Sequence, residues 1–192
     1  MTKYVIHRPD RTDRLGFIEE LKTQAVFDYT VFDAITDPVD PKLGLIASVK
    51  EIIRKEYNND SVLIFEDDVT FTSPCSVNTF FSALPSLRND IDFIVGGAHY
   101  CIPVSEMVHP LFRMKDFSGT HMILIYKRMF DFFLNSNITI HYDAFLSENL
   151  KSKKLIGYAV YPFVAKTINS YSDLRKEFVD DSVFFSKYLF KC

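Results

Sequence analysis

Three consecutive acids, Glu66-Asp67-Asp68, follow directly after the apolar run at residues 61–65. A continuous apolar run of this kind is typical of a strand that is buried on both faces of a sheet. Ligands of α/β sheets bind at the carboxyl ends of the strands, so we expect the three carboxylates at the ligand edge. Mg²⁺ and Mn²⁺ take carboxylate ligands together with substrate phosphates. The motif therefore predicts a divalent-cation site that neutralises a departing nucleotide diphosphate.

Side chains of an extended segment alternate in direction, which divides the three acids into two groups. Glu66 and Asp68 are expected on one side, where they would flank one Mn²⁺ or Mg²⁺ ion and contact the nucleotide sugar through it. Asp67 is expected on the opposite side and is a candidate catalytic carboxylate. The alternative is that the acids cap the next helix or face solvent.

Cationic and imidazole side chains recur at other predicted strand ends. Arg8, Arg11 and Arg14 lie in a loop after the first predicted strand, where bidentate contacts with donor phosphates are expected. His99 follows a Gly-Gly turn and His121 precedes another apolar run, and either imidazole could contact a metal or a diphosphate. Solvated arginines and purely structural histidines are the alternatives.

One further carboxylate, Asp143, follows a short β-like stretch at residues 137–142 and precedes a predicted helix. This position lets it reach the same sheet edge, where it would contact the acceptor or take the proton from an attacking hydroxyl as a general base. An N-cap of the helix at Ala144 is the alternative.

The elements that must position these residues alternate between apolar strands and amphipathic helices, which predicts an α/β fold with a mainly parallel sheet. Strands are expected at residues 4–7, 25–35, 61–65, 92–95, 120–126 and 158–167, and helices at 14–22, 42–57, 75–84 and 128–134. A single domain is expected over residues 1–170, with a helical appendage at 171–192.

Composition limits the class of protein. Hydrophobic residues make up 47% and charged residues 24% of the 192 residues, which is ordinary for a globular chain. The net charge of −3 gives no broad basic field for nucleic acid. Three widely spaced cysteines, Cys75, Cys101 and Cys192, indicate neither a disulfide framework nor a cysteine zinc site. Without a signal sequence or a long apolar run, a soluble protein in the cytoplasm is expected.

Four segments, in this order, resemble glycosyltransferase family 25, the lipooligosaccharide and collagen galactosyltransferase group. Residues 4–14 look like the family's opening strand and its arginine loop, and residues 42–49 are similar to its G-x-x-G-C-x-x-S-H segment. Residues 62–69 match its L-I-L-E-D-D-V segment nearly residue for residue. Residues 119–128 look like its G-x-x-A-Y-L-I-S stretch, and residues 141–143 stand in the place of its P-V-D.

The resemblance implies a GT-A-like (Rossmann-like) fold, a divalent metal on the acidic motif and a UDP-sugar or related donor. It places Gly44 and Ser48 in the donor-binding set and favours inversion of the anomeric centre, with Asp143 as general base. The chain departs from the pattern at Val49, where the family has His. A glycan or lipid-linked saccharide is the family's usual acceptor, and a protein or a modified nucleobase stays open.

Two other classes of function stay open. A metal-dependent phosphotransferase or nuclease would also use clustered carboxylates, but it would be expected to carry further acids at other strand ends and, for a nuclease, a basic surface. Asp143 is the only strong additional candidate in the sequence. A non-catalytic or degenerate nucleotide-sugar-binding protein would tolerate the acidic motif as a surface feature.

Overall fold

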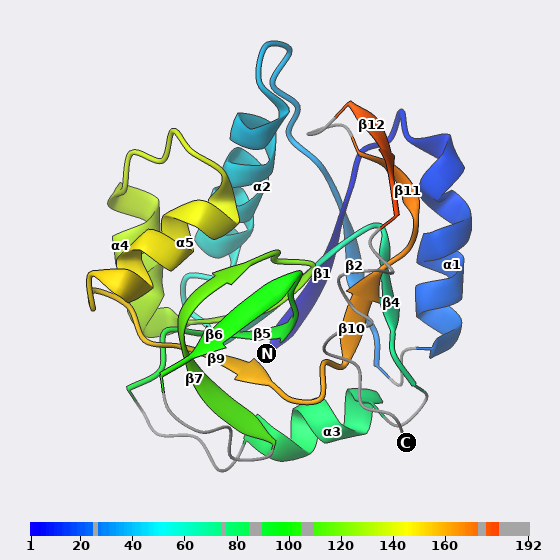
Figure 1. The fold of residues 1–192 in the computed structure, drawn as a ribbon. Helices are drawn as coiled ribbons and strands as arrows, with labels where there is room; N and C mark the ends of the chain where they lie inside the picture. The colour runs from blue at the N-terminus through cyan, green and yellow to red at the C-terminus, as the bar shows by residue number, and fades with distance from the viewer. Residues whose placement is uncertain (25–26, 74–75, 85–89, 105–109, 173–175, 181–192) are drawn as a thin grey trace.

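The core of the protein is an eight-stranded mixed sheet (Figure 1). The structure is a computed structural model that describes residues 1–24, 27–73, 76–84, 90–104, 110–172 and 176–180. In spatial order the strands are β2 (Thr30–Asp33), β1 (Thr2–His7), β3 (Ser61–Glu66), β8 (Met122–Tyr126), β5 (Phe93–Gly97), β9 (Gly157–Val160), β7 (Leu111–Ser118) and β6 (Tyr100–Pro103). β2, β1 and β3 pair in parallel, and so do β5 and β9. β8 and β7 run against their neighbours, so the remaining six strands share one direction.

Helices cover both faces of this sheet. Helices α2 (Pro41–Lys55), α4 (Phe130–Asn135) and α5 (Tyr142–Lys151) pack on one face, and α1 (Leu15–Gln24) and α3 (Ser76–Ala83) on the other. Alternation along the strands feeds the two layers: Val62 and Ile64 of β3 join the first cluster, while Leu63 and Phe65 join the second. The predicted α/β class, with a mainly parallel central sheet flanked by helices, is confirmed.

Local signals explain where α2 begins. Asp40 is the N-cap and its carboxylate accepts a hydrogen bond from the backbone N–H of Lys42 at 3.2 Å, while Pro41 occupies the first turn. Two short 3₁₀ turns, η1 (Thr12–Arg14) and η3 (Lys127–Met129), lead into α1 and α4.

Among the described residues, no helix is both long and apolar enough to span a bilayer.

Two small antiparallel pairs complete the structure. β4 (Val69–Phe71) pairs with β10 (Ala165–Thr167), and β11 (Ser170–Ser172) pairs with β12 (Glu177–Val179). The predicted strand at 158–167 is therefore two strands, β9 and β10, separated around Pro162. In Figure 1, β10, β11 and β12 lie on the same side of the sheet as α1.

Two expectations differ from the described structure, and one hairpin was not predicted. Residues 137–141 form no strand, because Ile138 is buried among the helices of the first face and Asp143 lies inside α5. The described part of the predicted helical appendage contains the extended pair β11–β12, while residues 181–192 lie outside the described residues. The hairpin of β6 and β7 was not predicted at all.

Candidate active site

The first two connections between strands of the sheet place a ligand crevice at the carboxyl ends of β1 and β3. The connection from β1 to β2 runs through α1 on one face, and the connection from β2 to β3 runs through α2 on the other. Connections that leave to opposite faces separate at their strand ends, and α/β proteins bind ligands at this switch point. The acidic motif occupies it, since Glu66 is the last residue of β3.

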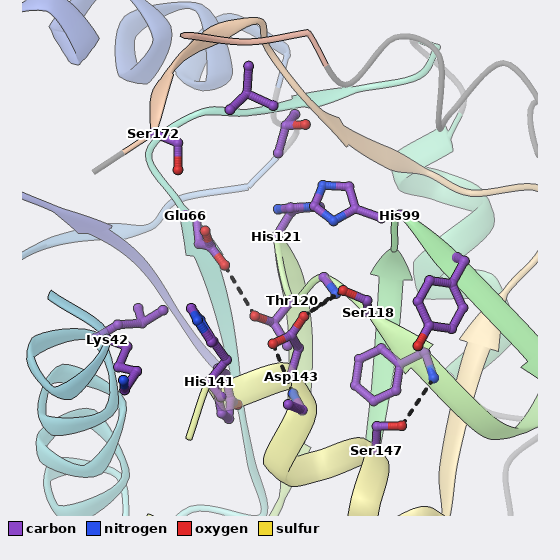
Figure 2. A pocket seen from close by; sticks show the side chains of 18 of the residues that line it. Lys42, Glu66, His99, Ser118, Thr120, His121, His141, Asp143, Ser147 and Ser172 are labelled. Atoms are coloured by element: carbon purple, nitrogen blue, oxygen red, sulfur yellow. Dashed lines mark hydrogen bonds between the residues drawn. The ribbon is translucent and has the colours of Figure 1, made fainter. Parts of the chain in front are cut away.

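Glu66 and Asp68 lie together at this edge with a third donor, His121. One donor atom from each of these three residues lies within 4.8 Å of the other two. The predicted division of the acids into two directions is thus seen in the structure, and His121 joins the pair. Figure 2 shows Glu66 and His121 facing the same space.

Asp67 has a different environment from its two neighbours. It is buried, its Oδ2 lies 2.8 Å from His7 Nδ1, and its Oδ1 accepts a hydrogen bond from Arg14 Nη1. These contacts connect the end of β1, the start of α1 and the acidic motif. They are the contacts of a structural anchor and do not support the catalytic role predicted for Asp67, although Asp67 borders the crevice.

Burial and charge repulsion act on Glu66. Burial, followed by the neighbouring charge of Asp68, raises the pKa of Glu66 to about 8, although a hydrogen bond donated by Thr120 Oγ1 at 3.2 Å opposes the rise. A raised carboxyl pKa means that the ionised group lacks a sufficient positive partner. Arg14 Nη2, at 3.1 Å from Asp68 Oδ2, supplies part of that charge.

The two predicted histidines form a pair. His99 follows β5 and His121 precedes β8, and their Nε2 atoms lie 3.2 Å apart with ring centroids at 4.6 Å. Gly119 makes room for them: its φ is +100°, and a Cβ there would lie 2.9 Å from His121 Nε2 and 3.1 Å from the backbone N of His99. An L side chain would be strained at this φ and would displace the imidazoles.

Asp143 also faces this space. Its Oδ2 accepts hydrogen bonds from Ser118 Oγ at 2.8 Å and from the backbone N–H of Gly119 at 2.9 Å, and its Oδ1 accepts one from the backbone N–H of Ala144 at 2.9 Å. The N-cap of α5 is His141, so Asp143 is a first-turn residue and not the cap. Figure 2 shows the Asp143 carboxylate directed toward Ser118 and Thr120.

Two hollows meet at the acidic motif. The first, of about 560 Å³, is lined by Glu66, Asp68, His121, Asp143 and residues of α5, β6 and β7. The second, of about 710 Å³, is lined by the loop after β1, the loop after β2 and the acidic motif. Glu66 and Asp68 border both hollows. A cation held by them would therefore contact ligands in either hollow.

The three predicted arginines lie in two different environments. Arg8 and Arg11 line the second hollow, where each pairs with an exposed acid, Asp10 and Asp13. Arg14 is buried, and its Nη2 donates to Ser170 Oγ at 3.2 Å and to the Tyr171 carbonyl at 3.0 Å besides its contacts with the acids. Arg14 therefore ties the acidic motif to β11, and it borders the second hollow together with Arg8 and Arg11.

Gly44 and Ser48 support a wall of the second hollow without lining either hollow. A Cβ on Gly44 would lie 2.5 Å from the carbonyl oxygen of Ile35, so only glycine permits the loop after β2 to pass over α2. Ser48 Oγ accepts a hydrogen bond from the backbone N–H of Ile35 at 2.8 Å. Val49, where the family pattern has His, is buried in the core.

Sequence reasoning missed the residues that support the predicted ones. Ser118 and Thr120 hold Asp143 and Glu66, and Tyr142 lines the first hollow with its buried hydroxyl unpartnered among the described residues. The signal for the first two was present, because both flank Gly119 in the segment that contains His121.

Comparison with known protein families and with curated proteins finds no match. Among solved structures, the chain is similar to A197 from STIV, at 11% identity and a TM-score of 0.52 over 94% of this chain and 87% of that one. A glycosyltransferase involved in the glycosylation of the major capsid of PBCV-1 matches at 11% identity and a TM-score of 0.43, over 69% of this chain, which spans 62% of that one. UDP-glucose pyrophosphorylase complexed with UDP-glucose matches at 11% identity and a TM-score of 0.48, over 97% of this chain and 96% of that one. At these identities, the likeness to A197 shows a shared fold and nothing about activity.

Proposed function

We propose that this protein is a divalent-cation-dependent glycosyltransferase of GT-A type that transfers a sugar from a nucleotide-sugar donor, a UDP-hexose, to an acceptor hydroxyl. One observation carries the proposal: Glu66, Asp68 and His121 bring donor atoms within 4.8 Å of one another where two hollows meet. The sequence resemblance to glycosyltransferase family 25 supports the choice of reaction.

The residues of the cluster fit a divalent cation. Two carboxylates and one imidazole suit Mn²⁺, which accepts nitrogen more readily than Mg²⁺ does. Burial and the charge of Asp68 raise the pKa of Glu66 although Arg14 lies beside Asp68, which supports a site that takes further positive charge. A bound divalent cation would supply that charge and neutralise the diphosphate as it leaves.

The second hollow is the site we assign to the nucleotide. It lies at the switch point between β1 and β3, and its walls are the loops that follow β1 and β2. Arg8 and Arg11 offer guanidinium groups there, a geometry that suits a diphosphate. The sugar of the donor would then extend past Glu66 and Asp68 into the first hollow, toward Asp143.

Asp143 is the group we assign to the proton of the acceptor. Three hydrogen-bond donors, from Ser118, Gly119 and Ala144, fix its carboxylate within the first hollow. A fixed carboxylate beside the acceptor hydroxyl takes up its proton as the oxygen attacks the sugar. Glu66 and Asp68 stay with the diphosphate side of the same space.

The test measures release of UDP from a set of UDP-hexoses in the presence of Mn²⁺ and a mixture of free saccharide acceptors. Asp143→Asn keeps an oxygen for Ser118 and Gly119 but cannot take a proton, so we expect its turnover to fall by roughly 10²–10⁴-fold. The matched control is Asp131→Asn, an exposed acid of α4 outside both hollows, whose turnover should equal that of the wild type.

Three results would contradict the proposal. The first is wild-type protein that releases no UDP from any donor of the set. The second is release that continues unchanged after Mn²⁺ is removed with EDTA. The third is an Asp143→Asn variant as active as the Asp131→Asn control. Donor binding without turnover would favour a nucleotide-sugar-binding protein instead.

A further inference from the structure

Two imidazoles lie beside the proposed cation site, but only one of them has a ring nitrogen close enough to Glu66 and Asp68 to share a cation with them, among the described residues. His121 groups with Glu66 and Asp68, whereas His99 contacts His121. Figure 2 shows the ring of His121 between Glu66 and His99. The Nε2 atoms of the two rings lie 3.2 Å apart, which is within hydrogen-bond distance.

The direction of this hydrogen bond decides what His121 can do. A neutral imidazole carries one N–H and one lone pair, so the nitrogen that donates fixes the nitrogen that can bind a cation. If His121 Nε2–H donates to His99, its Nδ1 lone pair is available to the cluster. If His99 donates instead, His121 carries its proton on Nδ1 and offers no lone pair toward Glu66 and Asp68.

We infer that His99 is a positioning residue for the cation site: its Nε2 accepts the Nε2–H of His121 and so presents Nδ1 of His121 to the cation. The inference rests on the proposed function, because it assumes that the cluster of Glu66, Asp68 and His121 holds a divalent cation. Histidines that bind metals nearly always donate their other ring N–H to a neighbouring acceptor, which fixes tautomer and ring orientation.

The surroundings of the pair show that it is built into the fold. His99 comes from the turn after β5 and its backbone N–H donates to the carbonyl of Ser118 at 2.7 Å. His121 is buried and lies two residues after Gly119, whose missing Cβ leaves room for both rings. The same Gly119 N–H donates to Asp143, so one turn positions both the imidazole pair and the proposed base.

The first test measures the dissociation constant of Mn²⁺ from the electron paramagnetic resonance signal of the free ion. His99→Leu removes the acceptor, and we expect Mn²⁺ to bind roughly 10–100-fold more weakly, as for other outer partners of metal-binding histidines. His99→Gln restores an acceptor oxygen and should bind Mn²⁺ within about threefold of wild type, since the tautomer is again fixed. His141→Gln, another histidine of the first hollow, is the matched control and should bind as wild type does.

The second test needs no variant to fold. In protein labelled with ¹⁵N at histidine and saturated with the diamagnetic ion Zn²⁺, nitrogen chemical shifts report which ring nitrogen is protonated. We expect His121 to carry its proton on Nε2 and His99 to carry its proton on Nδ1. Nδ1 protonation of His121 would overturn the inference.

The possible failures are distinguishable. If Mn²⁺ does not bind the wild-type chain, the proposed function fails as well. If Mn²⁺ binds and His99→Leu binds it equally well, only the role of His99 fails. Two directly coordinated nitrogens in the pulsed spectrum of bound Mn²⁺, with one lost in His99→Gln, would make His99 a ligand and reject the positioning role.

Discussion

Asp67 and its two neighbours are the same type of residue in one motif, yet the protein treats them differently. Asp67 is held by His7 and Arg14 and is buried with its charge compensated. Glu66 and Asp68 lie together, Arg14 contacts Asp68, and burial raises the pKa of Glu66 to about 8. The comparison indicates that the middle acid stabilises the fold, whereas the flanking acids form the cation site that we propose.

The strongest test of the comparison is the loss of the middle carboxylate. Asp67→Ala removes the carboxylate that contacts both His7 and Arg14, and leaves Arg14 with Asp68 as an acidic partner. Removing one member of a buried ion pair costs about 3–5 kcal/mol. Unfolding in urea measures the loss. The control Asp13→Ala breaks the exposed pair with Arg11 and should cost less than about 1 kcal/mol. Equal losses in the two variants would remove the anchoring role of Asp67.

Removing the charge of the flanking acid Glu66 should raise the unfolding free energy at high pH, whereas removing Asp67 should lower it. Its folded-state pKa, raised from 4.5 to about 8 by burial and by Asp68, means that its neutral form stabilises the fold below about pH 4.5 and that this stabilisation is lost as the pH rises through 8. Glu66→Gln has no charge to lose. In EDTA at about pH 9, the variant should therefore exceed the wild type by more than about 1 kcal/mol in unfolding free energy, the equivalent of about one pKa unit.

The same pair of proteins at about pH 4 provides the control, because Glu66 is then mostly neutral in both the folded and the unfolded wild type and the difference should nearly disappear. A Glu66→Gln variant that is less stable than wild type at both pH values would show that the Glu66 carboxylate is satisfied within the protein.

The comparison of compensated and uncompensated groups extends to two tyrosines. Tyr4 Oη donates to Glu56 Oε1 at 2.7 Å, whereas the buried Tyr142 Oη has no hydrogen-bond partner among the described residues. Tyr4→Phe should cost about 1.5–3 kcal/mol, because it removes a buried bond to a charged group. Tyr142→Phe should leave the unfolding free energy of the metal-free protein unchanged or raise it by less than about 1 kcal/mol. Thermal unfolding of both variants checks this, and a clear loss in Tyr142→Phe would mean that its hydroxyl is paired.

Much of the fold followed from the sequence because local patterns determine it. The apolar run before Glu66 predicted a strand buried on both faces, and the spacing of Leu45, Val49 and Ile52 predicted α2. The hairpin of β6 and β7 was missed, although Phe112 and Met114 alternate with Arg113 and Lys115 in the pattern of a strand buried on one face. Within the described residues 171–172 and 176–180, the expected helix is replaced by the pair β11–β12, and Arg11 and Arg14 both donate to the Tyr171 carbonyl there.

The site was predictable in its acids and less so in its partners. Because the acids follow an apolar strand, the sequence predicted the sheet edge on which Glu66 and Asp68 lie. The alternating direction of side chains in an extended segment predicted that Asp67 points away from them. No local pattern shows that Arg14 is buried against Asp67 while Arg8 and Arg11 pair with exposed acids. The contact of His99 with His121 also depends on the pairing of β5 with β8, which sequence spacing does not determine.

The most direct test of the central claim measures UDP binding by isothermal titration calorimetry with Mn²⁺ and with EDTA. We expect UDP to bind the wild type at least about tenfold more tightly with Mn²⁺, a difference of about 1.4 kcal/mol in binding free energy. Asp68→Asn should lose this dependence, and the control Asp131→Asn should keep it. UDP that binds equally in EDTA, or an Asp68→Asn variant that keeps the Mn²⁺ effect, would contradict the claim that the flanking acids hold the cation.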